Sequence, residues 1–168
     1  MTDLENFYFY RSNPNVTKHQ GFDVMNMQES SDFINKQKDK LFGKPDEWVQ
    51  YGIENNATKQ LIGDCAIKLS KPTNGTASIG ITITPTEQKK GFAKEILLGI
   101  LHFLFDIKKA HRVVETLSEA NIASEKLLID TGFRKEGLFI EDFLSDNKWT
   151  NTLQYAMLKR EWLNLLKK

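Results

Sequence analysis

The feature that most limits the fold is a row of three strand-like segments followed at once by the longest helical pattern in the chain. Residues 48–54 and 61–69 are rich in aromatic, β-branched and alternating apolar residues, and residues 77–84 have the same character. From 91 to 109, apolar residues recur every three or four positions, as in an amphipathic helix. This order predicts antiparallel hairpins with a long helix packed across them.

The second half of the chain alternates between the two periods. Residues 111–117 predict a strand, 123–130 a helix, 133–144 and 149–159 a closing hairpin, and 161–166 a short terminal helix. Consecutive strands followed by alternating strands and helices indicate an α/β (α+β) fold with a mixed sheet.

Composition limits the function classes. The chain has 168 residues, enough for one domain over 1–168 with a single core. Its 23 Lys+Arg against 22 Asp+Glu give a net charge of +1, which argues against a nucleic-acid binder. A lone Cys65 and scattered His19, His102 and His111 predict no metal site. There is no signal-peptide pattern and no apolar run of roughly 18 residues, so we expect a soluble, cytoplasmic protein without a membrane partner.

A polar loop, residues 88–93 (QKKGFA), precedes the long helix. Gly91 and Ala93 let a ligand approach the backbone, and the free N–H groups at a helix start attract anions. Lys89 and Lys90 add positive charge there. The loop is a candidate pyrophosphate site, although taken alone it is more simply interpreted as a helix start.

A second motif, residues 121–124 (NIAS), opens the helix predicted over 123–130. Asn121 is a good N-cap, and Ser124 falls within the first turn. Taken alone, this motif indicates a capped structural helix.

The two motifs in this order resemble those of the GNAT acetyltransferase superfamily. Its signatures, Arg/Gln-x-x-Gly-x-Gly/Ala and Asn-x-x-Ser/Ala followed by Gly-Phe, are matched here by Gln88, Gly91, Ala93, Asn121, Ser124, Gly132 and Phe133. The surrounding sequence, over about residues 7–160, is most similar to the branch that includes the ribosomal-protein N-terminal acetyltransferases RimL and RimJ.

The resemblance implies a three-layer fold with a mixed, mostly antiparallel sheet, helices on both faces, and a splay between strands 79–84 and 112–117. It also implies acetyl-CoA as co-substrate, with its pyrophosphate on the loop amides and its pantetheine arm beside the first of these strands. The positions that the resemblance assigns to the cofactor are Ile81, Ile83, Gln88, Lys89, Lys90, Gly91, Phe92, Ala93, Asn121 and Ser124.

The implied reaction is direct attack of a primary amine on the acetyl thioester within a ternary complex, which needs a group to take the amine proton. Glu141 and Asp142 are the candidates, of which Asp142 is favoured because adjacent strand residues face opposite ways. Glu54 is a further candidate base. Leu128 occupies the position where many relatives carry a tyrosine acid, which leaves Ser124 as the nearest hydroxyl.

The start of the chain departs from the family pattern. A turn, Ser12 to Val16, follows a short segment where relatives have a first strand and a helix. Either Leu4 to Tyr10 is a degenerate strand, or the first strand is absent and FYFYR ends a helix; the second interpretation is favoured and exposes a sheet edge. Further on, Ser30 to Asp32 predict the N-cap of a helix that ends before Gly43.

The sequence does not identify the acceptor of the acetyl group. The branch favours a protein N-terminal amine, and the alternatives are a small-molecule amine (an antibiotic, a polyamine or an amino acid) or a catalytically silent CoA-binding domain. Relatives commonly form homodimers, so a second copy is a possible partner.

Overall fold

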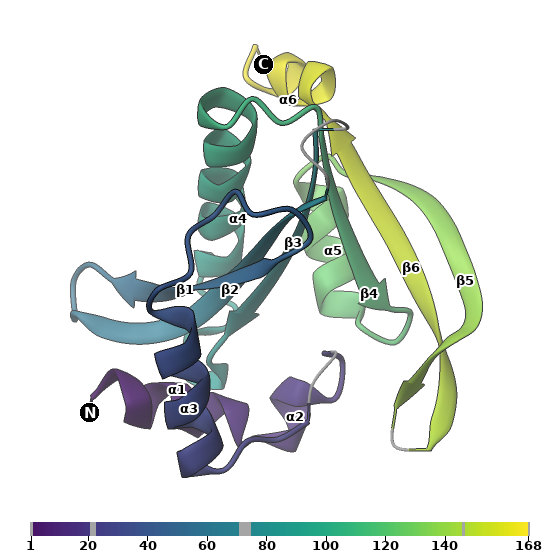
Figure 1. Ribbon diagram of the computed structural model, residues 1–168. Helices are drawn as coiled ribbons and strands as arrows, with labels where there is room; N and C mark the ends of the chain where they lie inside the picture. Colours follow the sequence, from purple (N-terminus) through teal and green to yellow (C-terminus); the bar gives the residue numbers. More distant parts are fainter. Residues whose placement is uncertain (1, 21–22, 71–74, 146, 168) are drawn as a thin grey trace.

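The computed structural model describes residues 2–20, 23–70, 75–145 and 147–167. At its centre is a six-stranded sheet with the order β1-β2-β3-β4-β6-β5 (Figure 1). The strands are β1 (Trp48–Asn55), β2 (Gln60–Ser70), β3 (Thr76–Ile83), β4 (Arg112–Ser118), β5 (Arg134–Ser145) and β6 (Lys148–Leu158). Only the β3–β4 pair is parallel among these neighbours, so the predicted mixed and mostly antiparallel sheet is confirmed.

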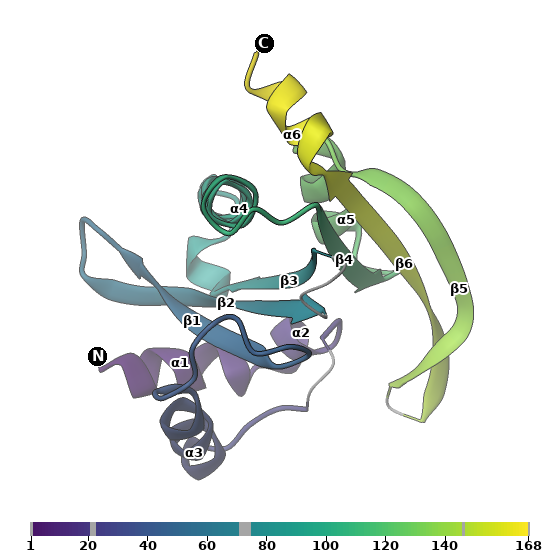
Figure 2. The ribbon, with the colours of Figure 1, turned by 45° about the horizontal axis from the view of Figure 1, so that its top comes forward.

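Helices cover both faces of this sheet. The helical segments are α1 (Asp3–Arg11), α2 (Pro14–Thr17), α3 (Met27–Gln37), the 3-10 turn η1 (Pro85–Glu87), α4 (Phe92–His102) with its π-helical extension η2 (Phe103–Ile107), α5 (Ile122–Asp130) and α6 (Lys159–Leu165). Helix α4 lies over one face, and α1 and α3 lie over the other, which gives three layers (Figure 2). No helix in the described ranges is long and apolar enough to cross a membrane.

Helix α3 starts earlier than its sequence suggested. Asn26 is the N-cap: its Oδ1 accepts a hydrogen bond from the Glu29 N–H at 2.9 Å, and the Glu29 carboxylate accepts from the Asn26 N–H at 2.7 Å. The prediction of an N-cap at Ser30 to Asp32 was therefore wrong, because this reciprocal capping box satisfies the free N–H groups one turn earlier.

In the described residues ahead of Trp48, three helices are present and no strand. Phe7 to Arg11 form the second half of α1, whose start is capped by Thr2. Strand β1 is accordingly one edge of the sheet, and β5 is the other.

The main core lies between the sheet and α4. It includes Ile67 and Ile79 from the strands and the fully buried Leu97, Leu101 and Leu104 from the helical segment. These positions recur at the spacing of one helical face, so the periodicity over 91–109 reflects real burial. The core thus anchors β3 and α4, the two elements that flank the loop 88–93.

A buried ion pair occupies the opposite face of the sheet, under α1. Asp64 on β2 accepts hydrogen bonds from Arg11 Nη2 at 2.7 Å and from the Tyr10 hydroxyl at 2.6 Å. Arg11 Nη1 also donates to Gln20 Oε1 at 3.0 Å, and Gln20 Nε2 donates to Thr82 Oγ1 at 2.7 Å. The network therefore fixes α1 and the segment near residue 20 against β2 and β3.

The parallel strands β3 and β4 are paired only at their beginnings. Thr76 to Ser78 pair with Arg112 to Val114, and the two strands then separate along their length (Figure 1). The splay predicted between these strands is therefore present, and it opens toward their carboxyl ends.

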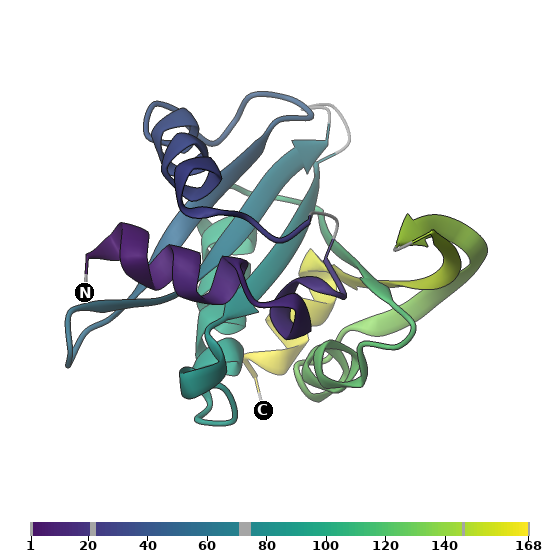
Figure 3. The same ribbon diagram turned by 90° about the horizontal axis from the view of Figure 1, so that it is seen from below.

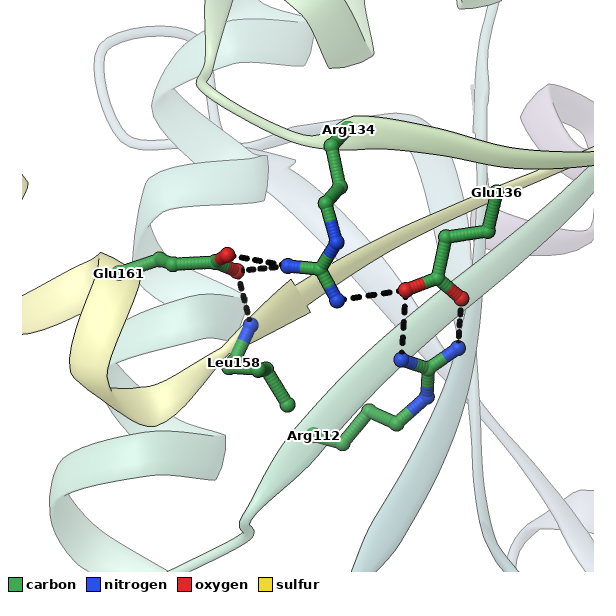
Figure 4. Close-up of polar contacts among 5 residues, drawn as sticks. All are labelled: Arg112, Arg134, Glu136, Leu158 and Glu161. Atoms are coloured by element: carbon green, nitrogen blue, oxygen red, sulfur yellow. Dashed lines mark hydrogen bonds and ion pairs between the residues drawn. The ribbon is translucent and has the colours of Figure 1, made fainter.

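Charged side chains stabilise the closed end of the splay (Figure 4). Arg112, the first residue of β4, donates to Glu136 at 2.8 Å through Nη1, and Arg134 on β5 contacts both Glu136 and Glu161. Glu161 also accepts from the Leu158 N–H at 2.7 Å, at the start of α6. Hydrogen bonds from Arg112 and then Arg134 hold the pKa of Glu136 down at about 2. This network ties β4, β5 and α6 together where the strands remain paired.

Candidate active site

The open edge of β3 faces the splay. The Thr84 N–H donates to the Ile62 carbonyl at 2.9 Å, toward β2. Since peptide groups alternate in direction along a strand, Ile83 and Ile81 direct theirs to the other edge, toward β4. Pairing with β4 ends at Ser78. The peptide group of Ile81 and the N–H of Ile83 are therefore placed to bond an extended ligand that lies along β3, whereas the Ile83 carbonyl already accepts from Gln88 Nε2.

The loop 88–93 presents unused backbone donors at the start of α4. In the described part of the chain, the N–H groups of these residues donate to no backbone carbonyl or side chain. Lys89 and Gly91 have positive φ angles of 61° and 93°, and Phe92 and Ala93 are the first, partly buried residues of α4. These donors at a helix N-terminus can bind an anion.

The side chains of the loop have unequal roles. Gln88 Nε2 donates to the Ile83 carbonyl at 2.9 Å, so this side chain fixes the loop to the end of β3. Lys90 forms an ion pair with Glu87 at 3.0 Å. Lys89 forms no ion pair with any described residue, which leaves its charge available to a bound anion.

Helix α5 begins beside the end of β4. Asn121 Oδ1 accepts a hydrogen bond from the Ser124 N–H at 3.2 Å, so Asn121 is the expected N-cap. The Ser124 hydroxyl and the Asn121 NH₂ group contact no described hydrogen-bond partner. Leu128 is completely buried in the core, and its position therefore offers no acid.

A pocket of about 520 Å³ lies at the open end of the splay, on the side of α2. Residues 18–20 form one wall, β4 residues 116–118 and Ala120 form the base, and the β5–β6 hairpin forms the opposite wall. Figure 3 shows the backbone of α2 and of the β5–β6 hairpin from this side of the molecule. The hairpin contributes Phe143, Ser145, Lys148, Thr150 and Thr152. The wall residue Gln20 donates through Nε2 to Thr82 Oγ1 on β3 at 2.7 Å, which fixes this wall of the pocket to β3.

The two acidic candidates on β5 differ in their surroundings. Thr152 Oγ1 lies 2.7 and 2.9 Å from the two carboxylate oxygens of Asp142, and Thr152 lines the pocket. Glu141 has a φ angle of 49° within a bulge of β5, and its backbone N–H donates to Asn151 Oδ1 at 2.9 Å. Only Asp142 of this pair contacts a described pocket residue.

The third carboxylate considered from the sequence lies elsewhere. Glu54 is exposed near the β1–β2 turn and pairs with Lys59 at 3.3 Å. It is not among the described residues that line the pocket.

His19 is a pocket residue that the sequence did not single out. Burial, followed by the charge of Lys18, lowers the pKa of His19 below its usual value, so the imidazole is neutral at neutral pH and can accept a proton. A lone histidine without a spaced partner gave no signal for this role.

Glu115 is a second such residue. It is the first residue of β4 beyond the pairing with β3, on the strand face that carries the core residues Val113 and Leu117. Desolvation raises the pKa of Glu115 to about 8, and no described residue forms an ion pair or hydrogen bond with its carboxyl group. In the segment HRVVETL, nothing distinguishes it from a surface residue.

Within the described ranges, no cluster of three or more histidine, cysteine, aspartate or glutamate side chains could hold a metal ion.

Comparisons with known proteins give a consistent result. The family model for the acetyltransferase (GNAT) domain matches residues 1–134. The uncharacterized N-acetyltransferase YnaD of Bacillus subtilis is 29% identical over 160 residues, which cover 95% of this chain and 90% of that protein. The crystal structure of a GNAT-family acetyltransferase from Bacillus anthracis matches with a TM-score of 0.83 at 25% identity, over 94% of this chain and 90% of that one. Spermidine N-acetyltransferase of Vibrio cholerae, in complex with CoA and spermine, matches with a TM-score of 0.79 at 22% identity, over 96% and 93% of the two chains.

Proposed function

Since the chain belongs to the GNAT family and is an acetyl-CoA-dependent N-acetyltransferase, we propose that it acetylates the primary amine of a small molecule held in the pocket at the open end of the splay. The observation that carries this proposal is the pocket itself. Its volume of about 520 Å³ is within the range of small-molecule sites, and its base is formed by β4 where that strand has left β3. The amine and the thioester can therefore approach from opposite faces of the sheet.

The residues around the splay fit acetyl-CoA. The free N–H groups of 88–93 suit the pyrophosphate, and a Cβ built on Gly91 would meet no atom within 4 Å, so space is open beside the backbone. The peptide group of Ile81 and the N–H of Ile83 suit the amides of the pantetheine arm. Asn121 and Ser124, at the start of α5, have side-chain groups free to contact the thioester end.

Within this proposal, Asp142 takes a proton from the bound ammonium, directly or through a water. The neutral nitrogen attacks the carbonyl carbon, so that the C–N bond forms as the C–S bond breaks. The nitrogen loses its second proton to the departing sulfur, directly or through a water, so that CoA leaves as the thiol, and Asp142 then releases its proton to solvent. The Ser124 hydroxyl can hydrogen-bond the sulfur or relay this proton to it. The peptide N–H of Ile81 or Ile83 can stabilise the carbonyl oxygen as its charge develops.

Two measurements test the proposal. Calorimetry should show that acetyl-CoA binds, and thiol release with DTNB across a panel of primary amines should show turnover. Binding without turnover for any amine, a peptide panel included, would support the silent CoA-binding alternative. Absence of acetyl-CoA binding would refute the function altogether.

A protein N-terminus is the second candidate acceptor, because the motifs resemble the RimL and RimJ branch. Placement in that branch and a cytoplasmic location stay predictions from the sequence. Acetylation of a peptide panel at higher kcat/KM than every small amine would favour this candidate over a small molecule.

We also propose that two copies associate through β5. This strand is a sheet edge with unpaired backbone groups, and Ile140, Leu144 and the adjacent Trp149 of β6 are 66%, 51% and 56% exposed. Light scattering after size exclusion should give twice the chain mass, and Ile140→Lys should give the monomer. A monomeric wild type would contradict the dimer.

A further inference from the structure

The pocket at the open end of the splay has charges of a single sign along its described lining. Lys18 stands on the wall formed by residues 18–20, and Lys148 stands on the opposite wall, formed by the β5–β6 hairpin. No aspartate or glutamate belongs to the lining in the described part of the chain. Neither ammonium group forms an ion pair or hydrogen bond with a described residue. Both positive charges are therefore available to a ligand.

The pocket also has two distinct ends. Thr116 of β4 lies next to the splay, and Thr152 brings the carboxylate of Asp142 to the same region. Lys18 and Lys148, in contrast, stand on the two walls beside β4, and both side chains are exposed. A molecule that reaches the thioester with its amine thus leaves its other end between two ammonium groups.

We propose that the acceptor is a small primary amine that also carries an anionic group, a carboxylate or a phosphate, which Lys18 and Lys148 bind while the amine lies near Thr116 and Asp142. This inference rests on the proposed function, since it names the chemical class of the acceptor for the same site. The inference disfavours polyamines as acceptors, because both lysines would repel a second ammonium group.

The surroundings of His19 are consistent with a positive charge on the wall formed by residues 18–20. Burial, and after it the charge of Lys18, lowers the pKa of His19, which lies next to Lys18 in the pocket. A bound anion would offset that charge, whereas a bound cation would add to it. The three apolar side chains of the lining, Leu117, Ala120 and Phe143, can pack against the methylene groups between the two ends of the acceptor.

The test uses three acceptors of equal length that differ in one terminal group: 5-aminopentanoate, pentylamine and 1,5-diaminopentane. Each presents the same primary amine, and the far end is negative, neutral or positive. We expect kcat/KM to fall in that order, with about 10-fold between the first and the last at low salt, since two exposed charges contribute modestly. Added NaCl should reduce the differences in kcat/KM among the three acceptors, because salt screens exposed charges. Phosphoethanolamine tests the phosphate arm in the same assay.

The variant Lys18→Glu/Lys148→Glu should reverse the order and make 1,5-diaminopentane the best of the three. Lys44→Glu is the matched control, because Lys44 is exposed, lies outside the pocket lining and carries the same charge. The control should keep the wild-type order. Binding of the three amines to the CoA-loaded protein, measured by calorimetry, gives a readout that does not depend on turnover.

An equal or better rate for the diamine in the wild type would overturn the inference, as would an unchanged order in the double variant. If acetyl-CoA binds but 5-aminopentanoate neither reacts nor binds more tightly than pentylamine, the charge inference fails while the proposed function stands. Loss of acetyl-CoA binding itself would count against the proposed function instead.

Discussion

The hydroxyl of Thr152 lies 2.7 Å from one carboxylate oxygen of Asp142 and 2.9 Å from the other. Thr152 is nearly buried and lines the pocket, whereas Asp142 is exposed on the neighbouring strand. The hydroxyl therefore orients the Asp142 carboxylate on β5 toward a cavity whose floor is formed by β4. This contact gives the carboxylate a defined position from which to take the proton of an amine.

Replacement of Asp142 by asparagine should lower kcat by about 10²-fold to 10⁴-fold, because the amide keeps the shape of the side chain but cannot accept the proton. Glu141→Gln is the control, because Glu141 lies in the bulge of β5. Its kcat should stay within about threefold of the wild type, far from the loss expected when a general base is removed. Rates measured from pH 6 to 9 by thiol release test both variants, with acetyl-CoA binding as a check on folding. If Asp142→Asn kept the wild-type rate and pH profile, Asp142 would be excluded as the general base.

Gly91→Val should weaken acetyl-CoA binding by about 10-fold or more. Gly91 has a φ angle of 93°, and a β-branched residue adopts such an angle only at a cost of about 1–2 kcal/mol or more. No atom lies within 4 Å of a Cβ built there, so the expected loss comes from backbone strain and from obstruction of the ligand. Gly99→Ala, in the middle of α4 and equally free of clashes, is the control and should bind normally. Calorimetry with acetyl-CoA measures both. Equal affinities for the two variants would contradict the assignment of the loop.

The sequence predicted the helices and strands correctly where their pattern depends only on residues close together in the chain. Alternation over residues 61–69 and helical spacing over 91–109 both follow from burial of one face, and the elements appear where the pattern placed them. Gly91 was recognisable because a residue without a side chain, just before a helix, lets a ligand approach the backbone. These rules need only neighbours in the chain, so one sequence suffices to apply them.

The pocket was not predictable in this way. Its residues come from the segment after α2, from β4 and from the β5–β6 hairpin, which only the tertiary fold brings together. Asp64 shows the same limit, because its strand suggested a single apolar face and gave no sign of a buried partner 53 positions away in α1. Long-range charge pairing leaves no periodic trace in the sequence.

Asp64→Asn should destabilise the protein by about 3–5 kcal/mol, since the change removes the carboxylate that pairs with the buried guanidinium of Arg11. Urea denaturation at pH 7 measures the loss. The double variant Arg11→Met/Asp64→Leu should recover part of it, because no unpaired charge then stays buried. A loss below about 1 kcal/mol for the single variant would show that the pair contributes as little as a surface ion pair.

Glu115 predicts a pH dependence of stability with a definite sign. The pKa of this carboxyl is raised from 4.5 in the unfolded chain to about 8 in the fold, so between these values the folded state keeps a proton that the unfolded state releases. Stability should therefore fall as pH rises through this window, by at most about 1.4 kcal/mol per pH unit from this group.

Glu115→Gln removes that loss, because an amide has no proton to release. Between pH 5.5 and 7.5 the free energy of unfolding of the wild type should fall by roughly 2 kcal/mol more than that of the variant. Urea denaturation at both pH values measures the difference, and Glu95→Gln, at an exposed position of α4, should keep the wild-type dependence. Parallel pH curves for the wild type and Glu115→Gln would show that Glu115 is ionised in the folded protein.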